Sequence, residues 1–159
     1  MPFKSTLTTD NKLKNISKIE ANASGSTLDI TNQTENFTID GAGSADVLKG
    51  GGGDDIITGK AGGDTLEGGS GNDTFKVDSG SDIINDLGGA AGGQSDILIV
   101  DSGATATASN IKSFTAGSTT KNLGTATLNS KAGTTTTINM SSAGAGNGFT
   151  LGGNSGVDT

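Results

Sequence analysis

The chain has 159 residues, of which 30% are hydrophobic, 3% are aromatic and 28 are glycine, so its apolar core is too lean for a large globular enzyme. It contains no His, Cys, Trp or Tyr, which excludes Ser–His–Asp and Cys–His catalytic sites, histidine or thiolate zinc sites, and disulfides. The formal net charge of −7 is concentrated in residues 40–101, where eleven Asp and one Glu face three Lys, and this density of like charge opposes folding unless cations neutralise it.

Residues 1–40 are rich in Lys, Asn, Thr and Ile. Residues 9–21 have an apolar spacing compatible with a short helix, whereas Gly, Asn and β-branched Thr make helices unfavourable along the rest of the chain. No apolar run is long enough for a membrane span, and residues 1–20 lack the hydrophobic stretch of a cleaved secretory signal. We therefore expect a mainly β protein without a membrane span.

Residues 41–101 are rich in Gly and Asp and contain a repeat of nine residues. Written as successive nonapeptides from Gly41, they read GAGSADVLK, GGGGDDIIT, GKAGGDTLE, GGSGNDTFK and VDSGSDIIN. The sixth position is always aspartate, and the fourth is glycine in every nonapeptide except the first, which has Ser44. An apolar residue occurs at every ninth position, namely Ile30, Ile39, Leu48, Ile57, Leu66, Phe75 and Ile84.

This period predicts a solenoid. Nine residues suffice for a six-residue turn and a three-residue strand, and a single apolar residue per strand is buried only if successive strands stack. A flexible acidic linker is the alternative that the glycine content and the charge would favour. A linker has no reason to keep an apolar residue at every ninth position, so we prefer the solenoid.

The nonapeptides resemble the RTX calcium-binding repeat, G-G-x-G-x-D-x-U-x with U apolar. The resemblance implies a right-handed parallel β-roll with two nonapeptides per coil and Ca²⁺ held in the turns by aspartate and main-chain oxygens. The paired aspartates would be Asp46 with Asp64, Asp55 with Asp73, and Asp64 with Asp82. Because the first and fifth nonapeptides depart from the pattern at Ser44 and Val77–Asp78, the pair of Asp55 and Asp73 is the best defined.

Carried onto this sequence, the resemblance assigns the metal to the turn aspartates and to the glycines that let the backbone approach it. These residues are Asp46, Asp55, Asp64, Asp73, Asp82, Gly50, Gly51, Gly53, Gly59, Gly62, Gly68, Gly69 and Gly71. Oxygen ligands alone suit Ca²⁺, which accepts six to eight of them, better than Mg²⁺, which demands octahedral geometry and retains water. The pairs Asp54–Asp55 and Asp78–Asp82 could also act as general acid and base. Asp55 and Asp82 are better explained as ion ligands, so we expect no catalytic residue and no enzyme.

Downstream, residues 82–86 and 96–100 resemble the strands that usually close such a roll. Residues 102–159 are rich in Ser, Thr, Ala and Gly and alternate as β-strands do, so they either extend the solenoid or form a small sandwich. Residues 36–46 align with residues 148–158 at a constant offset of 112, which suggests that the next unit of a tandem repeat begins there. We accordingly divide the chain into residues 1–40, a roll of residues 41–101, and residues 102–159.

These features favour a calcium-binding structural module of a secreted bacterial cell-surface protein, an S-layer or fibrous RTX adhesin. It would leave the cell by type I secretion, fold on extracellular calcium and assemble into a lattice or filament, with cell-surface polysaccharide as a further partner. The alternatives are the non-catalytic roll of a secreted protease, lipase or epimerase, and part of an RTX toxin. The scarcity of basic residues argues against nucleic acid as a partner.

Overall fold

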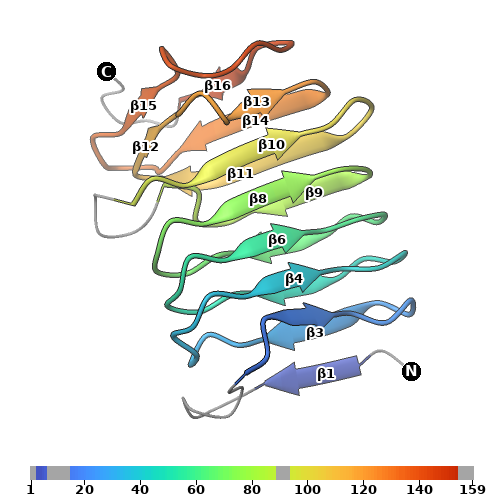
Figure 1. The fold of residues 1–159 in the computed structure, drawn as a ribbon. Coiled ribbons are helices and arrows are strands. Elements are labelled where there is room, and N and C mark those ends of the chain that lie inside the picture. Colours follow the sequence, from blue (N-terminus) through green and yellow to red (C-terminus); the bar gives the residue numbers. More distant parts are fainter. Residues whose placement is uncertain (1–2, 7–14, 89–93, 154–159) are drawn as a thin grey trace.

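The computed structural model describes residues 3–6, 15–88 and 94–153, and all regular structure in these ranges is β-strand. Strands wind into a stack of coils in which successive strands lie alternately on two parallel sheets (Figure 1). The first sheet consists of β1 (Phe3–Thr6), β3 (Ser26–Asp29), β5 (Val47–Lys49), β7 (Thr65–Glu67), β9 (Ser81–Ile84), β11 (Thr105–Ile111), β14 (Thr125–Ser130) and β16 (Thr150–Gly152). The expected mainly β solenoid is confirmed.

The second sheet faces the first and contains, in spatial order, β13 (Lys121–Asn122), β10 (Ile97–Val100), β8 (Thr74–Val77), β6 (Ile56–Thr58), β4 (Thr38–Asp40) and β2 (Lys18–Glu20). Every pairing in both sheets is parallel. A further parallel pair, β12 (Ser113–Thr115) with β15 (Thr137–Asn139), lies beside the later coils.

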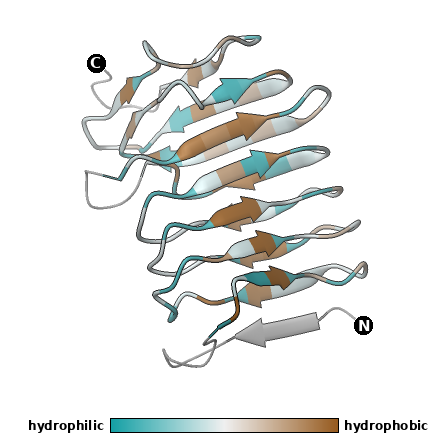
Figure 2. Ribbon diagram, in the orientation of Figure 1, coloured by the Kyte–Doolittle hydropathy of each residue, from teal (hydrophilic) through white to brown (hydrophobic). Residues whose placement is uncertain are grey.

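The core consists of two columns of apolar side chains, one from each sheet. The apolar residues at the predicted nine-residue spacing are all buried, and from Ile39 to Ile84 those of neighbouring coils lie directly opposite each other in the strand register. Ile30 follows the end of β3, and Leu28 takes its expected place opposite Leu48. Figure 2 shows the apolar residues distributed along the strands of successive coils. The first column is Leu28, Leu48, Leu66, Ile84, Ala108 and Leu128, and the second is Ile39, Ile57, Phe75 and Leu98. Stacking of successive coils therefore buries the apolar side chains that an isolated short strand would leave exposed to solvent.

At two places the strand arrangement differs from what the sequence suggested. The strands that were expected to close the roll, β9 and β10, lie inside it, because β11 pairs with β9 and β13 pairs with β10. Residues 102–153 thus extend the solenoid. Nearer the N-terminus, Lys18–Glu20 forms β2 and not part of a helix, because it pairs with β4. The Lys18 ammonium group also forms ion pairs with Glu20 and Asp40. Residues 9–14 of the expected helix lie outside the described residues.

The two segments related by the offset of 112 both contain a three-residue strand, β4 and β16. They belong to different sheets, since β4 lies in the second sheet and β16 in the first. Residues 154–158 of the later segment lie outside the described residues. The tandem repeat stays a prediction.

Candidate metal centre

The turns between the two sheets stack into two columns, one on each side of the roll (Figure 1). The first turn column contains residues 41–46, 59–64 and 77–82, which lead from the second sheet to the first. In the last of these, only residues 78–80 lie between the strands β8 and β9. The second turn column contains residues 50–55 and 68–73, which lead back. Turns of one column thus belong to alternate nonapeptides, and this brings together the aspartates that the sequence paired.

Each sixth-position aspartate is almost completely buried, with at most 1% of its surface exposed. One carboxylate oxygen of each accepts a hydrogen bond from a backbone N–H of the preceding coil. Asp46 N donates to Asp64 Oδ1 at 2.7 Å, Asp55 N to Asp73 Oδ1 at 2.8 Å, and Asp64 N to Asp82 Oδ1 at 3.0 Å. The first oxygens therefore form a ladder that fixes the distance between turns.

The second oxygens differ from turn to turn. Asp46 Oδ2 accepts from Ala42 N at 2.8 Å, and Asp55 Oδ2 accepts from Gly51 N at 3.0 Å. Asp64 Oδ2 and Asp82 Oδ2 are buried and have no hydrogen-bond donor among the described residues. A buried carboxylate oxygen without a partner is unfavourable, so these two atoms mark a place where a cation would be stabilising.

Glycines give the stacked turns their close approach. A Cβ at Gly59 would lie 2.6 Å from Oδ2 of both Asp64 and Asp82, so any side chain there would displace the carboxylates. Gly71 has a φ of +125°, and a Cβ on it would collide with the carbonyl oxygen of Gly53 in the turn below. Carbonyl oxygens of one turn thus face the glycines of the next, beside the aspartates.

The remaining glycines that the sequence assigned to the metal lie in the same two columns. An added Cβ would meet a carboxylate or a backbone carbonyl oxygen of a neighbouring segment at each of Gly50, Gly51, Gly53, Gly62, Gly68 and Gly69. The structure therefore brings the predicted aspartates and glycines together. Their role as ligands stays a prediction.

Burial dominates the electrostatics of these carboxyl groups. It raises the pKa of Asp64 to about 6 and the pKa values of Asp73 and Asp82 to about 7, whereas backbone N–H donors lower these pKa values and the charges of neighbouring carboxylates raise them. A hydrogen bond between the Asp64 and Asp82 carboxyl groups, formed when one of them is protonated, lowers the pKa of Asp64 and raises that of Asp82. Burial also raises the pKa of Asp55, whereas the N–H groups of Phe37 and Gly51 oppose this shift. Near neutral pH the ionised forms are unfavourable unless a cation is present.

Sequence reasoning missed Asp96, which is 3% exposed and continues the ladder in the second turn column. Asp73 N donates to Asp96 Oδ1 at 2.9 Å across a separation of 23 residues, and Gly88 N donates to Asp96 Oδ2 at 2.7 Å. The longer coil removes Asp96 from the nine-residue frame. The available signal was an aspartate directly before an apolar strand, the same arrangement as Asp55 before β6.

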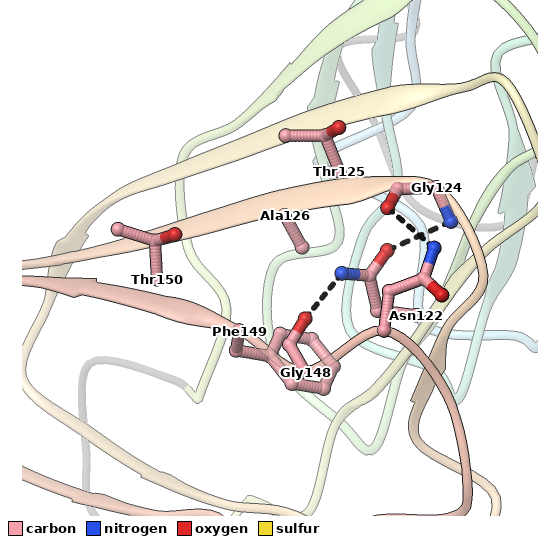
Figure 3. Close-up of a pocket in the computed structure, with 8 residues that line it drawn as sticks. Asn122, Gly124, Thr125, Ala126, Gly148, Phe149 and Thr150 are labelled. Carbon is pink, nitrogen blue, oxygen red and sulfur yellow. Dashed lines mark hydrogen bonds between the residues drawn. The ribbon is translucent and has the colours of Figure 1, made fainter.

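Near the last coils lies a hollow of about 300 Å³ without a charged side chain in its lining (Figure 3). The Asn122 amide nitrogen donates to the carbonyl oxygen of Gly148, and Gly124 N donates to Asn122 Oδ1 at 3.0 Å. The lining consists of Asn122, Gly124, Thr125, Ala126, Asn147, Gly148, Phe149 and Thr150. These amides join neighbouring turns without any acidic group.

The donor set of the two turn columns is oxygen alone, which fits Ca²⁺. Within residues 15–88 and 94–153, no three acidic, His or Cys side chains converge on one point as a metal site would require. A cation here would therefore depend on main-chain carbonyls as well as on paired carboxylates.

The fold and the turns define a parallel β-roll whose stacked, glycine-rich turns present acidic oxygens to one another. The family model of the RTX calcium-binding nonapeptide repeat (4 copies) matches residues 38–66 and 58–90. The chain thus carries RTX calcium-binding repeats. Comparisons with curated proteins and with solved structures give no match.

Proposed function

We propose that the chain is a calcium-dependent structural module of a secreted bacterial surface protein, of the S-layer or fibrous adhesin kind. The observation that supports calcium most directly is the pair of buried, unpartnered oxygens of Asp64 and Asp82 in stacked turns. Extracellular modules bind Ca²⁺ with dissociation constants of ~10⁻⁴ to 10⁻³ M, far above cytosolic free calcium. The module would therefore stay unfolded inside the cell and fold outside, which suits type I secretion.

The calcium ligands in this proposal are the predicted turn aspartates together with backbone carbonyls of the predicted glycines. Bound calcium would supply positive charge at the carboxylates and fix the separation of neighbouring turns. Each ladder member has one oxygen oriented by a backbone N–H of the preceding coil, and at Asp64 and Asp82 the second oxygen accepts no N–H and is available to an ion.

Assembly into a lattice or filament is the second part of the proposal. Among the described residues, the end strands of the two sheets, β1, β16, β13 and β2, each have a neighbour on one side only. At the β16 end, Leu151 follows Leu128 in the apolar column but is 55% exposed. An exposed strand edge is a template for pairing with another chain. No helix among the described residues is long and apolar enough to cross a membrane.

The pairing of turns is tested by replacing Asp55 and Asp73 together with alanine. We expect this variant to lose much of the calcium-induced β signal in circular dichroism, because two buried carboxylates of one turn column disappear. The measurement is a calcium titration of the variant beside the unaltered chain. An unchanged titration would refute the role of this pair.

The surface role is tested by electron microscopy of the protein in calcium. Ordered arrays that dissolve in EGTA would support an S-layer or fibre. A longer polypeptide carrying this segment together with a protease or lipase motif, HExxH or G-x-S-x-G, would instead favour the roll of a secreted enzyme. Polysaccharide binding is a separate expectation, measured by co-sedimentation with cell-wall material.

A further inference from the structure

The fifth nonapeptide, residues 77–85, lacks the opening glycine of the repeat, and its aspartate, Asp82, has different neighbours from the other turn aspartates. In the first four nonapeptides, a Cβ added to the opening glycine would contact Oδ2 of the aspartate five residues later. For Gly41, the distance from this Cβ position to Asp46 Oδ2 is 3.0 Å. The fifth opens with Val77, whose side chain is fully buried in the core as part of β8. Asp82 Oδ2 lies instead beside Gly59 of the preceding coil.

As a result, the second oxygens of two carboxylates, those of Asp64 and Asp82, lie beside the same glycine, Gly59. The position of a Cβ on Gly59 is 2.6 Å from Asp64 Oδ2 and 2.6 Å from Asp82 Oδ2. Both residues are at least 99% buried, and neither oxygen has a donor in the part of the chain that the structure describes. In the other turns where the contacts of the second oxygen are resolved, those of Asp46, Asp55 and Asp96, it accepts a backbone N–H.

A third acidic group, Asp78, belongs to the same place. It occupies the second position of its nonapeptide, where the repeat pattern has glycine, and its Oδ1 is buried without a hydrogen-bond partner in the described ranges. Asp78 lies in the connection between β8 and β9, four residues before Asp82. Asp64, Asp78 and Asp82 therefore each have a buried oxygen without a hydrogen-bond partner among the described residues, and they lie in two neighbouring turns of one column.

We propose that Asp78 supplies a third carboxylate to the calcium site between turns 59–64 and 77–82 and makes it the tightest site of the roll. This inference rests on the proposed calcium-dependent function. A negative charge close to a bound divalent cation strengthens its binding by Coulomb attraction. The side chains of Asp64, Asp78 and Asp82 do not converge on a single point in the described residues. Asp78 therefore acts on the bound ion through its negative charge, without a direct bond to the ion.

The test is calorimetric titration of calcium into the full chain and into Asp78→Asn. We expect the tightest binding step to weaken at least tenfold in Asp78→Asn, because one charge a few ångströms from a divalent ion has an effect of about this size even at the dielectric constant of water. Asp82→Asn should remove the same step, which assigns it to this pair of turns. Asp29→Asn is the matched control, because it removes one negative charge from a half-buried residue of β3 whose oxygen accepts from Thr31, and it should leave the step unchanged.

The outcomes separate this inference from the proposed function. If the unaltered chain binds no calcium, the proposed function fails. If it binds calcium and Asp78→Asn titrates like Asp29→Asn, the inference about Asp78 is wrong, whereas the proposed calcium-dependent function is retained. Should Asp78→Asn fold poorly, Asp78→Gly restores the repeat pattern at this position, and it should show the same weakened step with a normal β signal at saturating calcium; a step of unaltered affinity in Asp78→Gly overturns the inference.

Discussion

At the scale of single residues, each buried aspartate of the turns uses its two oxygens differently. One oxygen joins the N–H ladder between coils, as Asp73 Oδ1 does with Asp55 N. The other is satisfied locally or is left for an ion, and the glycine beside it decides how much space is available. Gly59 is the clearest case, because a methyl group there would meet the unpartnered oxygens of both Asp64 and Asp82.

Gly59→Ala should therefore weaken calcium binding while the sheets still form. The added Cβ has to displace two carboxylate oxygens, whereas the φ of Gly59 lies outside the positive region, so the backbone is not strained. We expect the midpoint of the calcium-induced β signal to move to a calcium concentration at least several-fold higher. The measurement is circular dichroism during a calcium titration.

Gly43→Ala provides the matched control, because Gly43 lies in the same turn column with nothing within 4 Å of its Cβ position. Its midpoint should coincide with that of the unaltered chain. Equal midpoints for Gly59→Ala and Gly43→Ala would show that the space at Gly59 is not used by an ion.

At the scale of elements, the coils of the acidic block and the later coils are joined by different chemistry. Ionised aspartates only accept hydrogen bonds, so stacking them buries negative charge that needs compensation. Asparagine amides both donate and accept. Asn122 does both, toward Gly148 and from Gly124, and Asn147 donates to the carbonyl oxygens of Leu123 and Gly124. The later turns thus stack as neutral elements.

Replacing the amide of Asn122 by a carboxylate should destabilise the last coils. Asn122→Asp loses the N–H that Gly148 accepts and places a buried negative charge against that carbonyl oxygen. We expect the free energy of unfolding in saturating calcium to fall by about 1–3 kcal/mol, the usual cost of an unsatisfied buried polar group. Urea denaturation measures this change.

Asn139→Asp is the comparison variant. Asn139 is exposed, and its side-chain oxygen accepts from Ser141 N at 3.0 Å, which a carboxylate can do equally well. Its free energy of unfolding should stay close to that of the unaltered chain. A similar loss in both variants would mean that added negative charge, and not the missing donor, destabilises the later coils.

At the scale of the whole molecule, the regular period explains which parts could be predicted. A coil of 18 residues keeps Asp46, Asp64 and Asp82 in one frame, so the columns of aspartates and apolar residues were visible in the sequence. Longer coils, such as the 23 residues between Asp73 and Asp96, hide the same stacking from a search at fixed spacing. Residues 18–20 were misassigned because local spacing suggested a helix, whereas pairing with β4 determines the structure.

The number of buried carboxyl groups gives the whole roll an unusual dependence on pH. Burial raises the pKa of Asp73 and Asp82 to about 7 and that of Asp64 and Asp96 to about 6 in the folded chain, against about 3.9 in an unfolded one. The folded state therefore binds more protons than the unfolded state between these values. It is stabilised by protonation at low pH, and this stabilisation is lost as the pH rises through 6 to 7.

Without calcium, the folded fraction of the chain should therefore fall as the pH rises from about 4 to about 7, so that the calcium-free chain is unfolded at neutral pH, opposite to the usual effect of aspartates held by ion pairs. Saturating calcium should remove most of this dependence, because the ion replaces the protons on the same carboxylates, and its binding should release protons near pH 7. Thermal unfolding followed by circular dichroism at several pH values, with and without calcium, measures both effects. A calcium-free roll that becomes more stable toward pH 8 would show that these aspartates are ionised and compensated by the protein itself, which would leave no electrostatic need for the ion.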